Sequence, residues 1–222
     1  MTTFLGLCQR LNQESGIPVI GPSTVIGQTG QMKRSVDWIA SAYEEIQSEH
    51  ADWQFLRADF SFPTVIGTVA YLPSAISLPE HADWITESIT VYTVSVADEQ
   101  ELTYVPWDEF RENYQLRTVT TGRPYLCSVK PDRSLALYPT PDAVYTVRGE
   151  YYKRAQTMTA DASEPLFPAR FHMILVWRAL MLYGAFESAA ECYSHGSKEY
   201  LRLFSQLEAN QLPRILLAGP LA

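Results

Sequence analysis

Apolar residues recur with a helical period in two stretches near the start of the chain. The first predicts a helix capped by Thr2 or Thr3 that runs to about Glu14, with one apolar face made of Phe4, Leu7, Cys8 and Leu11. A loop rich in glycine and proline follows, and Thr29 then begins a longer predicted helix over residues 30–50. The apolar stripe of this second helix consists of Val36, Ile39, Ala40, Tyr43 and Ile46.

The pattern changes to strands after residue 52. Short runs of alternating or aromatic residues, separated by proline and turn signals, predict an antiparallel sheet. We expect the last of these strands to pair with the strand directly before it. The predicted strands are Trp53–Phe62, Ser88–Val96, Leu102–Val105, a hairpin of Tyr125–Val129 and Leu135–Tyr138, and Val144–Tyr152, with a helical turn at Trp107–Tyr114.

Helical periodicity returns after Pro168. A helix that includes residues 171–186 is apolar nearly all round and should be buried, and a second helix is predicted from about Glu191 to Asn210. Pro213 ends that helix because proline cannot continue it.

The alternation of these patterns predicts the fold class. We expect an α+β chain in which a helical bundle from both termini carries an inserted antiparallel β domain. The predicted domains are a helical domain, a β-rich domain and an extended C-terminal arm, at residues 1–52 with 165–211, 53–160 and 212–222 respectively.

Composition narrows the classes of function. Hydrophobic residues make up 46% of the 222 residues and charged residues 19%, as in a folded globular protein. The formal net charge is −8, from 17 basic and 25 acidic residues, and no cluster of Lys and Arg is present for tight binding to nucleic acid. The three scattered cysteines, Cys8, Cys127 and Cys192, favour a reducing compartment over a disulfide framework. With no secretory signal and no apolar run long enough to span a bilayer, we expect a soluble protein made in the cytoplasm, with no part in a membrane.

The motifs of catalysis and cofactor binding are missing from the sequence. Residues 27–35 resemble a phosphate-binding loop only superficially, because Gly, Lys and Ser are not contiguous. His195 lies three residues from Cys192 on a predicted helix, and two candidate ligands are too few for a metal site. No Gly-x-Ser-x-Gly elbow is present, and neighbouring acids such as Glu44 and Glu45 are typical of a solvated surface. We therefore expect no enzyme activity, no cofactor and no metal.

The aromatic residues leave two interpretations open. Rings such as Trp53, Trp84, Trp107, Tyr151 and Tyr152 are typical of a sheet core with contacts at its edges, and they are also the residues of a sugar-binding platform. The second interpretation makes the chain a β-rich binding module for carbohydrate or another ligand.

Four stretches together give the chain a family likeness. It resembles the head-to-tail adaptor, or connector, proteins of tailed bacteriophages over about residues 2–205. The stretches are Thr3–Leu11 with Glu14–Gly16, Gly27–Gly30 leading into Val36–Ile39 and Ile46–Gln47, Trp53–Leu56 with Phe60–Phe62 and Tyr71–Pro73, and Phe167–His172.

The resemblance implies a structural virion protein of the neck. It implies a homo-oligomeric ring, a dodecamer in this family, with one face on the portal protein and the other on a tail or nozzle protein. DNA would pass through the ring without specific binding.

Two groups of residues are candidates for roles in such a ring. Glu44, Glu45 and Glu49 are candidates for the channel lining, since a negative wall repels phosphates, although a solvated helix face explains them equally. Contacts between subunits are expected from the aromatics of the β domain, because open sheet edges must be covered. The candidates for these contacts are Trp84, Tyr92, Tyr104 and Trp107.

The C-terminal segment is predicted to be an arm that docks on portal. Its apolar residues are costly to leave in water, since burying one Leu or Ile contributes roughly 1.5–3 kcal/mol. The segment could instead fold back on its own helices. The arm residues are Arg214, Ile215, Leu216, Leu217 and Leu221.

Overall fold

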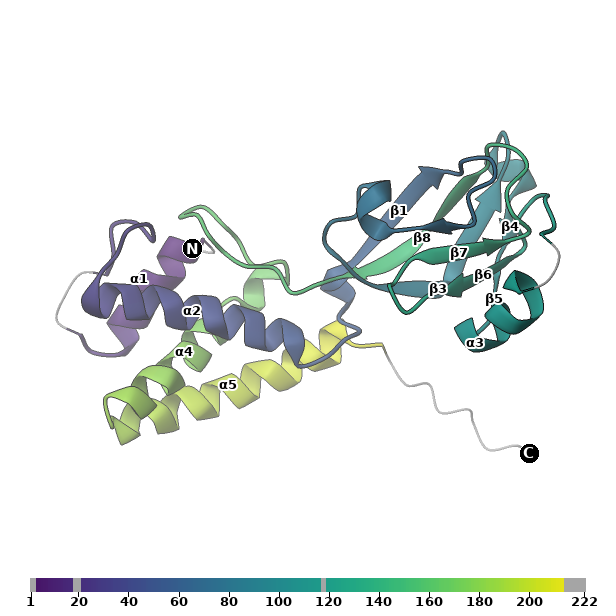
Figure 1. The fold of residues 1–222 in the computed structure, drawn as a ribbon. Coiled ribbons are helices and arrows are strands. Elements are labelled where there is room, and N and C mark those ends of the chain that lie inside the picture. Colours follow the sequence, from purple (N-terminus) through teal and green to yellow (C-terminus); the bar gives the residue numbers. More distant parts are fainter. Residues whose placement is uncertain (1–2, 18–20, 117–118, 214–222) are drawn as a thin grey trace, which may run out of the picture. The chain divides into compact units, whose positions relative to one another are not determined.

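The computed structural model describes residues 3–17, 21–116 and 119–213. The chain forms two compact units (Figure 1). Unit 1 contains residues 1–56 and 155–222, and unit 2 contains residues 57–154.

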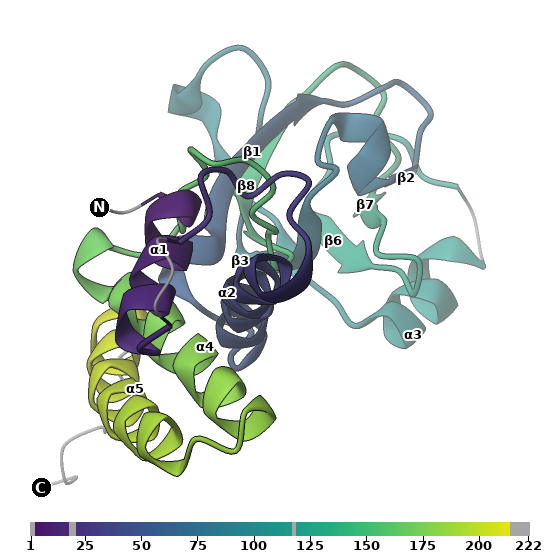
Figure 2. The same ribbon diagram turned by 90° about the vertical axis from the view of Figure 1, so that its left-hand side faces the viewer.

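Unit 1 is helical in its described part. Its helices are α1 (Phe4–Glu14), α2 (Gly30–Ser48), α4 (Met173–Phe186) and α5 (Ala190–Gln211), with short 3-10 turns at Gln54–Leu56 and Ala169–Phe171. The central helix is α4, which packs against each of the other three (Figure 2). This position follows from its sequence, because a helix that is apolar on nearly every side must be covered by others. Its buried residues are Ile174, Leu175, Val176, Ala179, Leu180 and Gly184.

The predicted helices of unit 1 are confirmed, with small changes at their ends. The α1 helix starts where Thr3 Oγ1 accepts a hydrogen bond from Gly6 N at 3.3 Å. Thr29 occupies the capping position of α2, but its side chain makes no capping hydrogen bond. The α5 helix ends at Gln211, two residues before Pro213.

Hydrogen bonds attach the returning chain, residues 155–168, to the first half of unit 1. Gln47 Nε2 donates to Gln156 O at 2.9 Å, and Gln156 N donates back to Gln47 Oε1 at 2.9 Å. The carboxylate of Asp161 accepts from Val25 N at 2.6 Å. Gln47 is 2% exposed, so its side chain needs these partners, since a buried amide without them would cost folding free energy.

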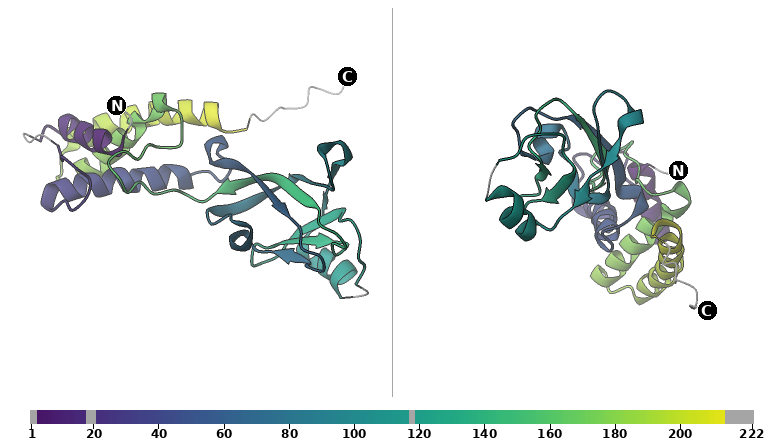
Figure 3. Two further views of the ribbon diagram at one scale, coloured as in Figure 1. Left: turned by 90° about the horizontal axis from the view of Figure 1, so that it is seen from above. Right: turned by 90° about the vertical axis from the view of Figure 1, so that its right-hand side faces the viewer.

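Unit 2 consists of two four-stranded sheets packed face to face (Figures 2 and 3). The first has the order β1-β8-β3-β4 and the second β2-β7-β6-β5. The first sheet's strands are β1 (Arg57–Pro63), β8 (Thr146–Lys153), β3 (His81–Tyr92) and β4 (Gln100–Glu101). Those of the second are β2 (Ala70–Tyr71), β7 (Leu135–Tyr138), β6 (Leu126–Val129) and β5 (Thr103–Tyr104). Strands of both sheets contribute to one core, in which Phe60 and Val147 lie in the same cluster as Cys127 and Leu137.

The predicted fold class is wrong in the form given above. The chain is α+β, but the structure does not show a terminal helical bundle carrying one antiparallel sheet. The helical turn predicted at Trp107–Tyr114 is confirmed inside unit 2, where α3 (Trp107–Phe110) continues into a π-helical turn at Arg111–Gln115. Moreover, β5 pairs with β6 in parallel. The helical segment between these two strands provides the crossover that a parallel pair requires.

The predicted pairing of the last strand is also wrong. The β6–β7 hairpin is present, with Val129 opposite Leu135, but β8 pairs with β1 and β3 in the other sheet. Pro139 and Pro141 follow β7 directly, and neither has an N–H to continue a ladder, so the chain leaves that sheet.

Two predicted strands have different limits. The run Ser88–Val96 leaves the sheet after Tyr92, where the Asp98 carboxylate accepts from Thr93 N at 3.2 Å and begins a loop. The run Trp53–Phe62 begins with a 3-10 turn, and Trp53 belongs to the core of unit 1, where its Nε1 donates to Ile46 O at 3.0 Å.

The contact between α4 and α5 depends on two glycines. A Cβ at Gly184 would lie 2.7 Å from Tyr193 N, and one at Gly196 would lie 2.9 Å from Trp177 O. We expect Gly184→Ala to lower the free energy of unfolding of unit 1 by about 1–3 kcal/mol, because backbone must move to admit the methyl group. Urea titration of helical circular dichroism measures this loss.

Gly122→Ala is the matched control, since its added Cβ meets only Pro139 atoms at 3.8 Å or more. Equal stability of the two variants would contradict the close approach of α4 and α5.

Candidate interaction surfaces

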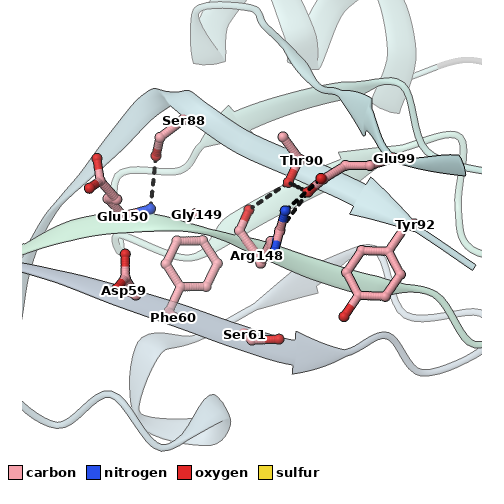
Figure 4. Close-up of a pocket in the computed structure, with 10 residues that line it drawn as sticks. All are labelled: Asp59, Phe60, Ser61, Ser88, Thr90, Tyr92, Glu99, Arg148, Gly149 and Glu150. Carbon is pink, nitrogen blue, oxygen red and sulfur yellow. Dashed lines mark hydrogen bonds and ion pairs between the residues drawn. The ribbon is translucent and has the colours of Figure 1, made fainter. Parts of the chain in front are cut away.

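The outer face of the first sheet carries a polar groove of about 760 Å³ (Figure 4). Strand alternation places Phe60 and Val147 in the core and sends Asp59, Ser61 and Arg148 to the outside. A bulge in β3 between Ile85 and Thr90 shapes the groove. The groove is lined by Asp59, Phe60, Ser61, Ser88, Thr90, Tyr92, Glu99, Arg148, Gly149 and Glu150.

Arg148 and Glu99, two charged residues of this groove, form an ion pair with each other. Arg148 Nε and Nη2 donate to the two carboxylate oxygens of Glu99 at 2.5 and 2.6 Å, and Thr90 Oγ1 donates to the same carboxylate at 2.5 Å. The hydrogen bonds from Arg148 and Thr90 lower the pKa of the Glu99 carboxyl, and the same bond to Glu99 raises the pKa of Arg148. Both groups therefore stay charged over a wide pH range, and they fix the loop before β4 to β8.

A second groove, of about 620 Å³, is apolar and opens beside β1 and β2. None of the residues that line this groove has a charged side chain. Tyr71 shapes one wall, because its hydroxyl accepts from Val65 N at 3.0 Å and lies 3.1 Å from Thr68 O. Val65 and Leu72 remain 60% and 46% exposed at its rim. The lining residues are Ser61, Phe62, Pro63, Val65, Thr68, Ala70, Tyr71, Leu72, Ala75, Ile76 and Ser77.

The edge of β1 beside this groove is open. Glu150 N donates toward β3, to Ser88 Oγ at 2.8 Å, so Gly149 and Tyr151 direct their backbone groups toward β1. Their partners are Phe60 and Ala58, which leaves Asp59 and Ser61 facing away from the sheet. Neither has a backbone partner on that side among the described residues. An unpaired edge of this kind is a template for contact with another chain.

The loop between β3 and β4 exposes two valines that sequence analysis did not single out. Val94 is 90% exposed and Val96 55% exposed. The base of this loop is fixed, because Arg123 Nη2 donates to Val91 O at 3.0 Å and also to Asp98 O. The alternation of apolar and polar residues predicted a strand here. Only the polar residues Thr93 and Ser95, next to the two valines, were consistent with a loop.

The four predicted subunit contacts do not form one surface. Trp84 is buried in unit 2, where it stacks edge-on against Phe60 at 4.9 Å and donates to Arg133 O at 2.9 Å. Tyr92 lies in the polar groove and Tyr104 is 42% exposed on β5. Trp107 begins α3, half-buried beside Phe110. Their role between subunits stays a prediction.

The predicted channel residues share α2 but have different surroundings. Glu45 accepts from Arg178 Nε of α4 at 2.7 Å, and this ion pair joins the two helices. Glu44 and Glu49 are exposed. The named residues of the predicted docking arm, from Arg214 to Leu221, lie outside the described residues.

The residues considered for catalysis or ligand binding in the sequence lie in structural positions. Residues 30–35 of the glycine-containing motif form the first turns of α2. Burial raises the pKa of Cys8 and of Cys127 to about 12, so neither is a ready nucleophile. Within residues 3–17, 21–116 and 119–213, no group of three or more His, Cys, Asp or Glu is placed to hold a metal ion. In the same described ranges, no helix combines the length and apolarity needed to cross a membrane.

A comparison with protein families identifies the class of the protein. The family model of the SU10 adaptor protein matches residues 2–218. The chain belongs to this family of phage structural adaptors, which associate with the virion and interact with its other proteins. The match includes both units, and it confirms the resemblance found in the sequence. No curated protein matches the chain.

One titratable group in unit 2 makes its stability depend on pH. The centroid of the His81 ring lies 4.2 Å from that of Trp84, and burial lowers the pKa of His81 from 6.5 to about 4. The unfolded chain therefore binds a proton between these pH values that the folded chain does not. We expect the free energy of unfolding to fall as the pH is lowered from 6.5 to 4, and His81→Phe to reduce this dependence. Thermal unfolding of unit 2 at several pH values measures it.

His195→Phe, in unit 1, serves as the control and should leave the pH dependence of unit 2 unchanged. An unaltered pH dependence in His81→Phe would show that other groups are responsible.

Proposed function

We propose that the chain forms a ring in the phage neck that joins the portal to the tail and surrounds the passage for DNA. The observation that carries this proposal is the family match over residues 2–218, which spans the helical unit and the sheet unit alike. Both units therefore belong to the adaptor, and each is available for a different contact. The ring, the portal and the tail or nozzle protein are the finer parts of the proposal.

The surfaces of unit 2 support an assembly role. An open strand edge, an uncharged apolar groove and an exposed apolar loop occur together on one small unit. Monomeric proteins normally cover or blunt such features, whereas proteins that assemble use them.

The polar groove is the one observation that favours the alternative, a β-rich binding module for carbohydrate or another tail-associated ligand. It combines the Tyr92 ring with hydroxyl and carboxylate groups. However, Arg148 and Glu99, its strongest polar groups, bond to each other. We therefore favour the adaptor.

Removal of the C-terminal arm tests whether the chain joins the portal to the tail. We propose that the C-terminal arm, residues 212–222, docks on another chain, with portal as the expected partner. A chain ending at Pro213 should fold, because α5 ends at Gln211, and should lose affinity for purified portal at least tenfold. Co-sedimentation with portal rings measures the change.

The intact chain is the reference for this experiment. If it does not bind portal at all, the joining function is wrong. If the truncated chain binds as tightly as the intact one, the arm has no part in docking on portal.

We propose further that Glu44 and Glu49 contribute to a negative channel lining, while Glu45 is held by Arg178. Replacing both with Lys should make assembled rings retain DNA at low salt, and increasing salt should release it. The control is Glu109→Lys with Glu112→Lys, an equal charge change at exposed positions of unit 2. Electrophoresis of DNA with each ring measures retention. Equal retention by both variants would place Glu44 and Glu49 away from the channel.

A further inference from the structure

Two apolar features of unit 2 lie on opposite edges of the same sheet. The loop between β3 and β4 exposes Val94 and Val96 and lies at the β4 edge of the sheet. The apolar groove begins at the end of β1, which is the other edge strand in the order β1-β8-β3-β4.

Both features also lie at the same end of the strands. Pro63 is opposite Thr146 in the β1–β8 ladder, and Thr146 is opposite Tyr92 in the β8–β3 ladder. Pro63 and Tyr92 are therefore in one row across the sheet, about 10 Å apart by the usual strand spacing. The chain enters the groove wall directly after Pro63 and the exposed loop directly after Tyr92.

We propose that Val94 and Val96 of one copy insert into the apolar groove of the next copy, forming the contact between subunits in the ring. The inference rests on the proposed ring and names its interface. A protrusion on one edge and a matching groove on the opposite edge make a head-to-tail contact, which repeats in one direction and gives a ring when the rotation between neighbouring copies closes. Because the two are at the same level along the strands, neighbouring copies stand side by side without a shift.

Charge favours a second copy as the occupant. The chain carries a net charge of −8, so two copies repel each other wherever acidic surfaces meet. The loop residues Thr93 to Ala97 have no charged side chain, and the groove lining has none either. This uncharged pair of surfaces allows identical acidic chains to approach, and it excludes water from both.

The two partners are also prepared for contact. Arg123 and Asp98 hold the base of the loop, so little freedom is lost when its tip inserts. Tyr71 holds the Val65–Thr68 wall of the groove open in the same way. The open edge of β1 lies beside the groove, so the backbone of the inserted loop can form hydrogen bonds with the backbone of Asp59 and Ser61.

Complementary variants test the direction of the contact. Val94→Asp removes the protrusion and Leu72→Asp blocks the groove, and both side chains are exposed enough that the monomer should remain folded. Each variant alone should need at least a tenfold higher concentration to assemble than the unchanged chain. A mixture of the two should form pairs that grow no further, because one variant keeps the groove and the other keeps the loop. Native mass spectrometry of the full chain measures these species.

Val119→Asp is the matched control, since Val119 is a 72% exposed valine outside the loop and the groove. It should assemble like the unchanged chain. Assembly of Val94→Asp and Leu72→Asp at the unchanged concentration would overturn the contact while leaving the ring intact. If the unchanged chain forms no oligomer alone or on portal, the proposed ring is wrong and the contact with it.

Cross-linking gives a second reading that does not depend on affinity. In a Cys192→Ser background, Val94→Cys combined with Leu72→Cys should form disulfides between copies, producing a ladder of covalent oligomers. Val119→Cys combined with Leu72→Cys should not. Absence of the ladder from oligomers formed by the first pair would also overturn the contact.

Discussion

The antiparallel pairing of β1 with β8 is the interaction on which the rest of the structure depends. These two strands are the first and last of unit 2, and Arg57 lies opposite Tyr152 at the ends of their ladder. The pairing brings the entry and the exit of a 98-residue insertion next to each other. The segments before and after it, residues 1–56 and 155–222, together form unit 1. An ion pair between Arg57 and Glu150 reinforces the strands at this point.

Unit 1 uses the two chain segments in different ways. The helix α4 comes from the second segment and is apolar on nearly every side, while α1 and α2 come from the first segment and pack against it. Specific polar contacts then fix the register of one segment on the other. Gln47 bonds Gln156, Asp161 bonds Val25, and the Leu166 amide donates to the Tyr43 hydroxyl at 3.1 Å. Apolar burial favours association in many arrangements, whereas these bonds select one.

The sequence predicts the elements of this fold better than their pairing. A helical period identifies α1 and α5 because each has one apolar face, and turn residues identify the β6–β7 hairpin. The strands that pair with β8 cannot be predicted in the same way. The residues between β7 and β8 indicate only that the chain turns there, not which strand β8 joins. The candidate surfaces were mostly missed for a related reason. Trp84 has the composition of an interface residue but fills the core, whereas Val94 has the alternation of a strand and lies at a loop tip. Exposure depends on the packing of distant strands, which local patterns do not contain.

The buried thiols have a consequence for the durability of the particle. Cys8 and Cys127 lie at 0% exposure, one in each unit, with their pKa values raised to about 12. Oxidation and disulfide exchange proceed through the thiolate at an accessible sulfur. Both conditions fail at these positions while the protein is folded. An adaptor built in this way keeps its two cores chemically unchanged when the surroundings of a virion become oxidising, without requiring any disulfide for its strength.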